Sequence, residues 1–317
     1  MFWSRLRNYL YDKNVLKAVR APGFVISVGN LTWGGTGKTS FVESLSRFLI
    51  SQGDRLAIIS RGYLRTSSGP KLVADGTGLK CSWKESGDEA YLLAKAIPEA
   101  IVVVSEERSD AFPLLAPFSP AVILLDDAFQ HRKIARDLDL VLVDASEDIT
   151  AQKVIPFGKL REEPRSLHRA DAIVLTHSNQ SNAATKDWIS QNVQCPVFHA
   201  NYLPDGDVPL AKKKVAAFCA IGSPQHFYRL LSEQGAELVA TKSFRDHHVF
   251  TREEIEEFRR EATQKGAEFI ATTAKDAVRI DPDWFDPFLK VIRVKLQIAE
   301  EALFFDFLNN TMHRGKV

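Results

Sequence analysis

The apolar positions along the chain predict a largely parallel β-sheet with helices between its strands. Six short, β-branched runs follow one another over residues 24–28, 56–60, 101–104, 122–125, 138–143 and 173–176. Continuous apolar runs of this length are typical of strands that are buried on both faces of a parallel sheet. Helical patterns separate them, such as residues 39–52 with Gly53 after their end, and they imply right-handed βαβ crossovers. We therefore expect a doubly wound, mainly parallel α/β sheet.

A second α/β region is predicted beyond a linker. Residues 201–213 concentrate Pro, Gly and Asp, which is typical of a connecting segment. Apolar runs resume at residues 215–221, 238–240, 269–272 and 291–294. The length of 317 residues fits two domains. The expected organisation is an N-terminal segment over 1–22, a larger domain over 23–205 and a smaller α/β domain over 206–317.

Residues 1–22 form a basic amphipathic segment that ends at Pro22-Gly23. Apolar and basic side chains alternate at roughly helical spacing: Phe2, Trp3, Leu6, Tyr9, Leu10, Leu16 and Val19 with Arg5, Arg7, Lys13, Lys17 and Arg20. An interfacial membrane helix uses such a face. A helix packed on its own domain shows the same pattern, and the sequence leaves both interpretations open.

Composition narrows the class of protein. With 45% hydrophobic and 26% charged residues, the chain is globular rather than disordered or fibrous. A net charge of +1 argues against a protein that binds nucleic acid through an overall excess of positive charge. Cys81, Cys195 and Cys219 lie far apart, as expected for thiols in a reducing compartment. There is no apolar run of about 20 residues and no signal-like N-terminus. We expect a protein that is cytosolic or attached to the cytosolic side of a membrane.

A glycine-rich segment, Thr32-Trp33-Gly34-Gly35-Thr36-Gly37-Lys38-Thr39, lies between a predicted strand and a predicted helix. Small residues in this setting let backbone N–H groups converge on phosphate oxygens. Lys38 would neutralise phosphate charge and the Thr39 hydroxyl would bind Mg²⁺. Thr32 replaces the usual first glycine of this motif. An ordinary strand-to-helix turn would explain the glycines but not the Lys-Thr pair after them, so we predict a P-loop nucleotide site.

Two carboxylates, Asp126 and Asp127, end the apolar run 121–125. In a parallel sheet this position lies beside the phosphate loop, where acids bind Mg²⁺ or orient its water ligands. Helix capping would also place Asp at a strand end. The phosphate loop favours the metal-binding interpretation, and His131 follows in a polar cluster at the same edge.

Three further groups are ambiguous from spacing alone. Asp88, in Gly87-Asp88-Glu89, precedes a helical stretch and is either an N-cap or a general base for a hydroxyl acceptor. Asp246-His247-His248 is either part of a proton relay or a metal site, or a set of ordinary surface or core side chains. Arg161, in Leu160-Arg161-Glu162, would grip a γ-phosphate if its turn lies near the nucleotide.

Taken together, these motifs resemble the tetraacyldisaccharide 4'-kinase family of lipid A biosynthesis. The resemblance rests on Gly29-Asn30-Leu31-Thr32 before the phosphate loop and extends over nearly the whole chain. The other matching segments, in chain order, are Leu10-Tyr11-Asp12, Arg61-Gly62-Tyr63, Gly87-Asp88-Glu89-Ala90, Asp126-Asp127-Ala128-Phe129-Gln130-His131-Arg132, Leu160-Arg161-Glu162, Ala220-Ile221-Gly222, Phe244-Arg245-Asp246-His247-His248 and Thr273-Ala274-Lys275-Asp276-Ala277. Ser40 and Ala128 stand where the family often has proline and glycine.

The resemblance implies a P-loop NTPase-like kinase that uses ATP and Mg²⁺. Its acceptor would be the 4'-hydroxyl of a tetraacylated disaccharide 1-phosphate at the cytosolic face of a Gram-negative inner membrane, bound peripherally. Asp88 would be the base with His247 as its partner, the latter chosen over His248 only by its place after Asp246. The remaining roles carried over are phosphate binding by Gly34, Gly35, Thr36, Gly37, Lys38, Thr39 and Arg161, metal binding by Thr39, Asp126, Asp127 and Glu162, and further active-site positions at Glu89 and His131.

The alternatives come from different classes of protein. A P-loop GTPase switch or metallochaperone should have an Asn-Lys-x-Asp motif that recognises guanine. In Thr273-Ala274-Lys275-Asp276 the Lys and Asp are adjacent, so this motif is absent. A membrane-surface scaffold without turnover leaves Lys38, Thr39 and the acidic pair unexplained. The sequence does not fix the oligomeric state, and a monomer is compatible with it.

Overall fold

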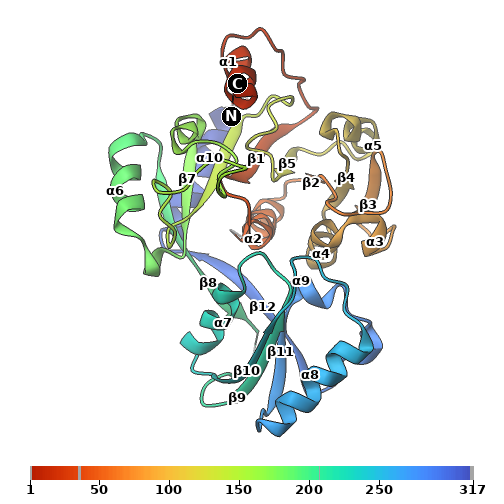
Figure 1. Ribbon diagram of the computed structural model, residues 1–317. Helices are drawn as coiled ribbons and strands as arrows, with labels where there is room; N and C mark the ends of the chain where they lie inside the picture. Colours follow the sequence, from red (N-terminus) through yellow and green to blue (C-terminus); the bar gives the residue numbers. More distant parts are fainter. Residues whose placement is uncertain (1, 35–36, 207, 315–317) are drawn as a thin grey trace. The chain divides into compact units, whose positions relative to one another are not determined.

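The computed structural model describes residues 2–34, 37–206 and 208–314. The chain divides into two compact units, Met1–Asn201 with Leu296–Val317, and Tyr202–Lys295. Figure 1 shows the helices and strands of both units. No helix among the described residues is long and apolar enough to cross a bilayer.

The first unit is built on a mainly parallel sheet with the strand order β8-β7-β6-β1-β5-β2-β4-β3. Neighbouring strands pair in parallel except β3 and β4, which are antiparallel. The strands are β1 (Phe24–Asn30), β2 (Leu56–Ser60), β3 (Lys71–Asp75), β4 (Ile101–Val104), β5 (Val122–Asp126), β6 (Leu138–Asp144), β7 (Ala172–Thr176) and β8 (Val197–Asp205). Because β1, β2, β4 and β5 run the same way, their carboxyl ends meet at one edge of the sheet.

Helices pack on this sheet because its central strands are apolar on both faces. One core cluster contains Val25, Ile59 and Leu125, and another contains Val141 and Ile173. The helices are α1 (Phe2–Asp12), α2 (Lys38–Ser51), α3 (Trp83–Ser86), α4 (Asp88–Ala96), α5 (Phe112–Leu115), α6 (Ala183–Asn192) and α10 (Glu301–Arg314). The last helix packs on the phosphate-loop helix α2 through two ring contacts, Phe41 with Phe304 and Phe48 with Phe305.

The second unit is a smaller parallel sheet with the order β10-β9-β11-β12. Its strands are β9 (Lys214–Cys219), β10 (Glu237–Ser243), β11 (Phe269–Thr273) and β12 (Leu289–Ile298), and its helices are α7 (Pro224–Glu233), α8 (Arg252–Gln264) and α9 (Ala274–Ala277). Phe218 packs against Phe250 and Phe258 in one core cluster, and Val215 packs with Phe227 and Leu231 in another.

The predicted fold class is confirmed, and each predicted apolar run falls on a strand. Two strands were missed. β3 is a five-residue antiparallel edge strand, and β8 has alternating rather than continuous burial. The end of β8 also includes residues 201–205 of the predicted linker. The three-part division stays a prediction, although contacts group α10 with the first unit rather than with the second.

Candidate active site at the carboxyl edge of the first sheet

The glycine-rich segment has the predicted strand–turn–helix setting. β1 ends at Asn30, and α2 begins at Lys38. Gly37 directly precedes the helix with φ 73° and offers no side-chain cap, so the first N–H groups of α2 are left for another acceptor. A helix N-terminus of this kind favours anions such as phosphate. Gly35 and Thr36 lie outside the described residues.

The acidic pair lies beside this helix N-terminus. Asp126 ends β5 in register with Val28 of β1. The Nζ of Lys38 is 3.4 Å from the Oδ1 of Asp127, and Arg161 donates to both oxygens of that carboxylate at 2.7 and 2.8 Å. The fold thus brings together Lys38, Asp127 and Arg161 from three separate motifs.

The pKa values of the two neighbouring aspartates are shifted in opposite directions. Burial, together with the nearby charges of Glu89 and Asp127, raises the pKa of Asp126 to about 6. Burial also acts to raise the pKa of Asp127, but Lys38 and Arg161 outweigh it and hold that pKa below its usual range. Asp127 is therefore ionised at neutral pH, whereas the charge on Asp126 is costly until a cation neutralises it.

These groups fit a magnesium ion. Carboxylate and hydroxyl oxygens are the ligands that Mg²⁺ prefers. The Oδ2 of Asp126 accepts one hydrogen bond, from the Ser60 hydroxyl at 3.0 Å. A buried carboxylate with a raised pKa is the kind of group that a divalent cation would stabilise.

Arg108 is a site residue that sequence reasoning missed. Its side chain is 4% exposed, and its Nη2 donates to the backbone oxygens of Asp126 at 2.8 Å and Asp127 at 3.0 Å. Asp127 has φ 49°, a left-handed conformation that is unusual for Asp, and this bridge helps to hold it. The only sequence signal was the place of Arg108 shortly after the carboxyl end of β4.

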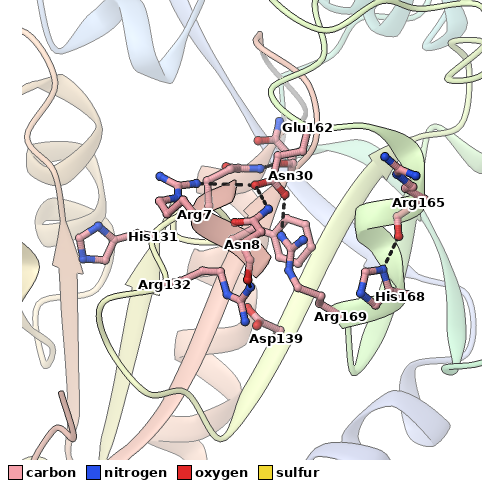
Figure 2. A network of polar contacts seen from close by, with 12 residues as sticks. Arg7, Asn8, Asn30, His131, Arg132, Asp139, Glu162, Arg165, His168 and Arg169 are labelled. Atoms are coloured by element: carbon pink, nitrogen blue, oxygen red, sulfur yellow. Dashed lines mark hydrogen bonds and ion pairs between the residues drawn. The ribbon is translucent and has the colours of Figure 1, made fainter. Parts of the chain in front are cut away.

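The carboxylate of Glu162 contacts side chains of α1 and of the segment that follows Glu162 in the chain. As Figure 2 shows, its Oε1 accepts from Asn8 at 2.9 Å, its Oε2 accepts from Arg169 at 2.6 Å, and Arg7 lies 3.7 Å away. The side chain is 3% exposed. Because both oxygens are engaged, Glu162 would have to exchange partners to bind a metal.

The roles of Asp88 and His131 stay predictions. Asp88 is buried as the first residue of α4, and its Oδ1 accepts from the Glu89 backbone N–H at 2.9 Å, which is a helix-end contact. Burial, followed by the charge of Arg108, lowers the pKa of His131 to about 4. His131 is therefore neutral near pH 7 and lies 3.6 Å from Glu107.

In the second unit the two adjacent histidines differ. His248 stacks on Phe244 and lies 2.8 Å from Glu254, which completes the capping box of α8, so it has a structural role. His247 has φ 106°, a strained conformation, and lies 3.6 Å from Asp246. Its pairing with Asp88, which belongs to the other unit, stays a prediction.

The model of the tetraacyldisaccharide-1-P 4'-kinase family matches residues 1–313. The chain belongs to this family. Two curated members, both named tetraacyldisaccharide 4'-kinase, are similar to it. The one from Chlorobium phaeovibrioides is 38% identical over 90% of this chain and 85% of its own length, and the one from Chlorobaculum tepidum is 41% identical over 87% and 82%. The crystal structure of LpxK from Aquifex aeolicus in complex with ATP is 34% identical, with a TM-score of 0.78 over 97% of this chain and 94% of that one.

Membership of the kinase family confirms the resemblance, and local structure explains its glycine pattern. Thr32, in place of the usual first glycine, forms an antiparallel bridge with Leu160, so this position is extended and needs no glycine. Gly29, by contrast, is required because a Cβ there would lie 2.6 Å from Phe129. The family's signature therefore reflects packing between β1 and the segment that follows the acidic pair.

Proposed function

We propose that this kinase transfers the γ-phosphate of ATP to the 4'-hydroxyl of tetraacyldisaccharide 1-phosphate. The observation that supports it best is the convergence of Lys38 and Arg161 on Asp127, next to Asp126, at the N-terminus of α2. Among P-loop proteins this arrangement stabilises charge on a transferring phosphoryl group. The guanine reader that a GTPase switch needs is missing, and the match to the kinase family extends over nearly the whole chain.

We assign the phosphates to the loop Gly34–Gly37, Lys38, Thr39 and Arg161. Mg²⁺, when bound, neutralises charge between the phosphates, and Thr39, Asp126 and Asp127 would hold it, with Glu162 joining once released from its present partners. On ATP binding, Lys38 and Arg161 exchange Asp127 for phosphate oxygens.

We assign Asp88 as the base that accepts the proton of the 4'-hydroxyl, and His247 as its partner. Burial at a helix N-terminus keeps Asp88 fixed in orientation. The charge of Glu89, the residue after Asp88, raises the pKa of Asp126. The acceptor and metal sites are therefore linked electrostatically. His131, neutral near pH 7, would act as a hydrogen-bonding group rather than as a cation.

The assay that tests this function uses ³²P-labelled ATP, Mg²⁺ and purified disaccharide 1-phosphate in nonionic detergent. We expect a labelled bisphosphorylated product with the new phosphate at the 4' position. Folded protein that binds ATP but transfers no label to this acceptor would exclude the proposed function.

We further propose that α1 holds the enzyme on the cytosolic face of the inner membrane. The polar side of α1 contacts its own unit, since Asn8 binds Glu162 and the Asn8 carbonyl accepts from Arg132. Tyr9, Val15 and Leu16 in and after this helix are exposed. Both interpretations of the segment therefore find support, one in the contacts of Asn8 and the other in these exposed apolar side chains.

Replacing Tyr9, Val15 and Leu16 together with serine is expected to weaken binding to anionic vesicles about tenfold or more, because apolar contact area is lost while every cation remains. Vesicle flotation measures this. Substitution is preferable to deletion, which would also remove the partners of Glu162. Val249→Ser, at an exposed apolar position in the other unit, is the control and should float like wild type. Equal flotation of the triple variant would leave α1 as a purely structural helix.

A further inference from the structure

Trp33 has an indole ring that packing in the core does not explain. The residue lies in the glycine-rich segment between β1 and α2. It is 60% exposed, whereas Leu31, two positions earlier, is 2% exposed. Single exposed aromatic side chains are common on protein surfaces and need no explanation by themselves. The ring of Trp33 differs from these because a charged group of the candidate active site lies over it.

The charged group is the guanidinium of Arg161. Its Cζ atom lies 5.9 Å from the centroid of the Trp33 ring. A cation within about 6 Å of an aromatic centroid is attracted by the negative face of the ring, and this attraction is strongest for Trp. The Arg161 side chain is 24% exposed, so water screens the attraction only in part. The indole therefore stabilises the cation at this place.

The backbone holds these two side chains beside each other. Thr32 and Leu160 form an antiparallel bridge, and the Trp33 N–H donates to the Lys159 carbonyl at 2.7 Å. In this ladder Trp33 and Arg161 are diagonal neighbours on one face, a separation that aromatic and long side chains can span. Because the ladder is made by main-chain atoms, a substitution of the indole leaves it in place.

The carboxylate of Asp127 and the ring of Trp33 hold Arg161 in different ways. The Nη1 of Arg161 donates to both oxygens of Asp127 at 2.7 and 2.8 Å, so a phosphate that takes these N–H groups must displace the carboxylate. The contact with the ring depends on the positive charge of the guanidinium and occupies no N–H donor. Arg161 can therefore keep the indole contact while it exchanges Asp127 for phosphate.

We propose that Trp33 is a positioning residue, which keeps the Arg161 guanidinium beside the phosphate loop while its N–H groups pass from Asp127 to the phosphates of ATP. This inference rests on the proposed function, in which Arg161 binds phosphate. Trp33 acts through Arg161 and not on the reacting atoms. Without the ring, the long arginine side chain would populate more rotamers once Asp127 is released, and the orientation that binds phosphate would be less occupied.

A double-mutant cycle tests this role in the transfer assay. We expect Trp33→Leu to lower kcat/KM for ATP by roughly three- to tenfold, the range for one cation–π contact, with an unchanged KM for the disaccharide. Trp33→Phe should lose less, because it keeps an aromatic face. In an Arg161→Gln background, Trp33→Leu should change kcat/KM by less than about twofold, since no cation is left to hold. Phe157→Leu, at an aromatic residue that is 83% exposed, is the matched control and should behave like wild type.

Equal losses from Trp33→Leu in both backgrounds would overturn the proposal, as would an effect confined to the KM for the disaccharide. Equilibrium titration with ATP and Mg²⁺ repeats the cycle without an acceptor. If Arg161→Gln matched wild type both in this titration and in kcat/KM for ATP, Arg161 would have no phosphate to contact and the inference would be wrong. Absence of transfer by wild type, with the coupling still present in ATP binding, would instead count against the proposed function alone.

Discussion

Replacing Asp88 with alanine is expected to lower kcat by roughly 10²–10⁴-fold while nucleotide binding stays nearly intact, which is the range for a lost general base. Asp88 is buried at the start of α4, where its Oδ1 accepts a hydrogen bond from the Glu89 N–H. That contact would stabilise the helix in any protein. The kinetic effect is therefore the part that distinguishes a base from a helix-capping residue.

Two measurements separate these roles. Thermal unfolding reports loss of the helix-end contact, for which about 1 kcal/mol is expected. Single-turnover transfer with saturating ATP reports the chemical step. Asn182→Ala removes the side-chain cap of α6 and is the matched control, with a similar loss of stability and wild-type kcat. If Asp88→Ala turned over at the wild-type rate, Asp88 would have no part in the mechanism.

Asp126→Asn is expected to raise stability and abolish most activity at the same time. In the folded protein the pKa of Asp126 lies at about 6, above its ordinary value of 3.8. The folded state therefore loses stability as pH rises from 3.8 to about 6, and this penalty is complete above pH 6 and absent below pH 3.8. Without metal or nucleotide, the variant should be about 2–3 kcal/mol more stable than wild type at pH 7.5, with the difference vanishing near pH 4. Its kcat should fall by about 10²-fold or more, because a carboxylate that would hold Mg²⁺ is lost.

Urea unfolding at the two pH values measures the stability effect. Asp127→Asn is the matched control and should have the opposite sign at pH 7.5, because Lys38 and Arg161 lose the carboxylate that they surround. If both variants were destabilised equally at pH 7.5, the inference that Asp126 and Asp127 differ in pKa would be wrong. A stabilised, inactive Asp126 variant would show that stability is sacrificed at this site for metal binding.

Much of the site was predictable because its motifs are local. A strand, a glycine-rich turn and a Lys-Thr pair at a helix start lie within sixteen residues, from Phe24 to Thr39. The same holds for an apolar strand that ends in Asp126 and Asp127. Parallel β1 and β5 bring these motifs to one edge, and that arrangement follows from the apolar pattern alone.

Other features depend on contacts between residues far apart in the sequence. Arg108 bridges to the Asp126–Asp127 backbone, and Asn8 reaches Glu162 across 154 residues. No periodicity marks such pairs. The edge strand β3 and the half-exposed strand β8 were missed for a related reason, since their pairing partners rather than their own patterns make them strands.

The sequence by itself determined the fold class, the phosphate loop and the family, because these depend on short segments whose residue types have few alternative uses. The tertiary structure decided which of two adjacent aspartates is ionised, which of two adjacent histidines packs against an aromatic core, and which cation lies over the exposed ring of Trp33. The physical reason is that burial and the distances between charges set these properties, and both exist only after distant segments have packed together.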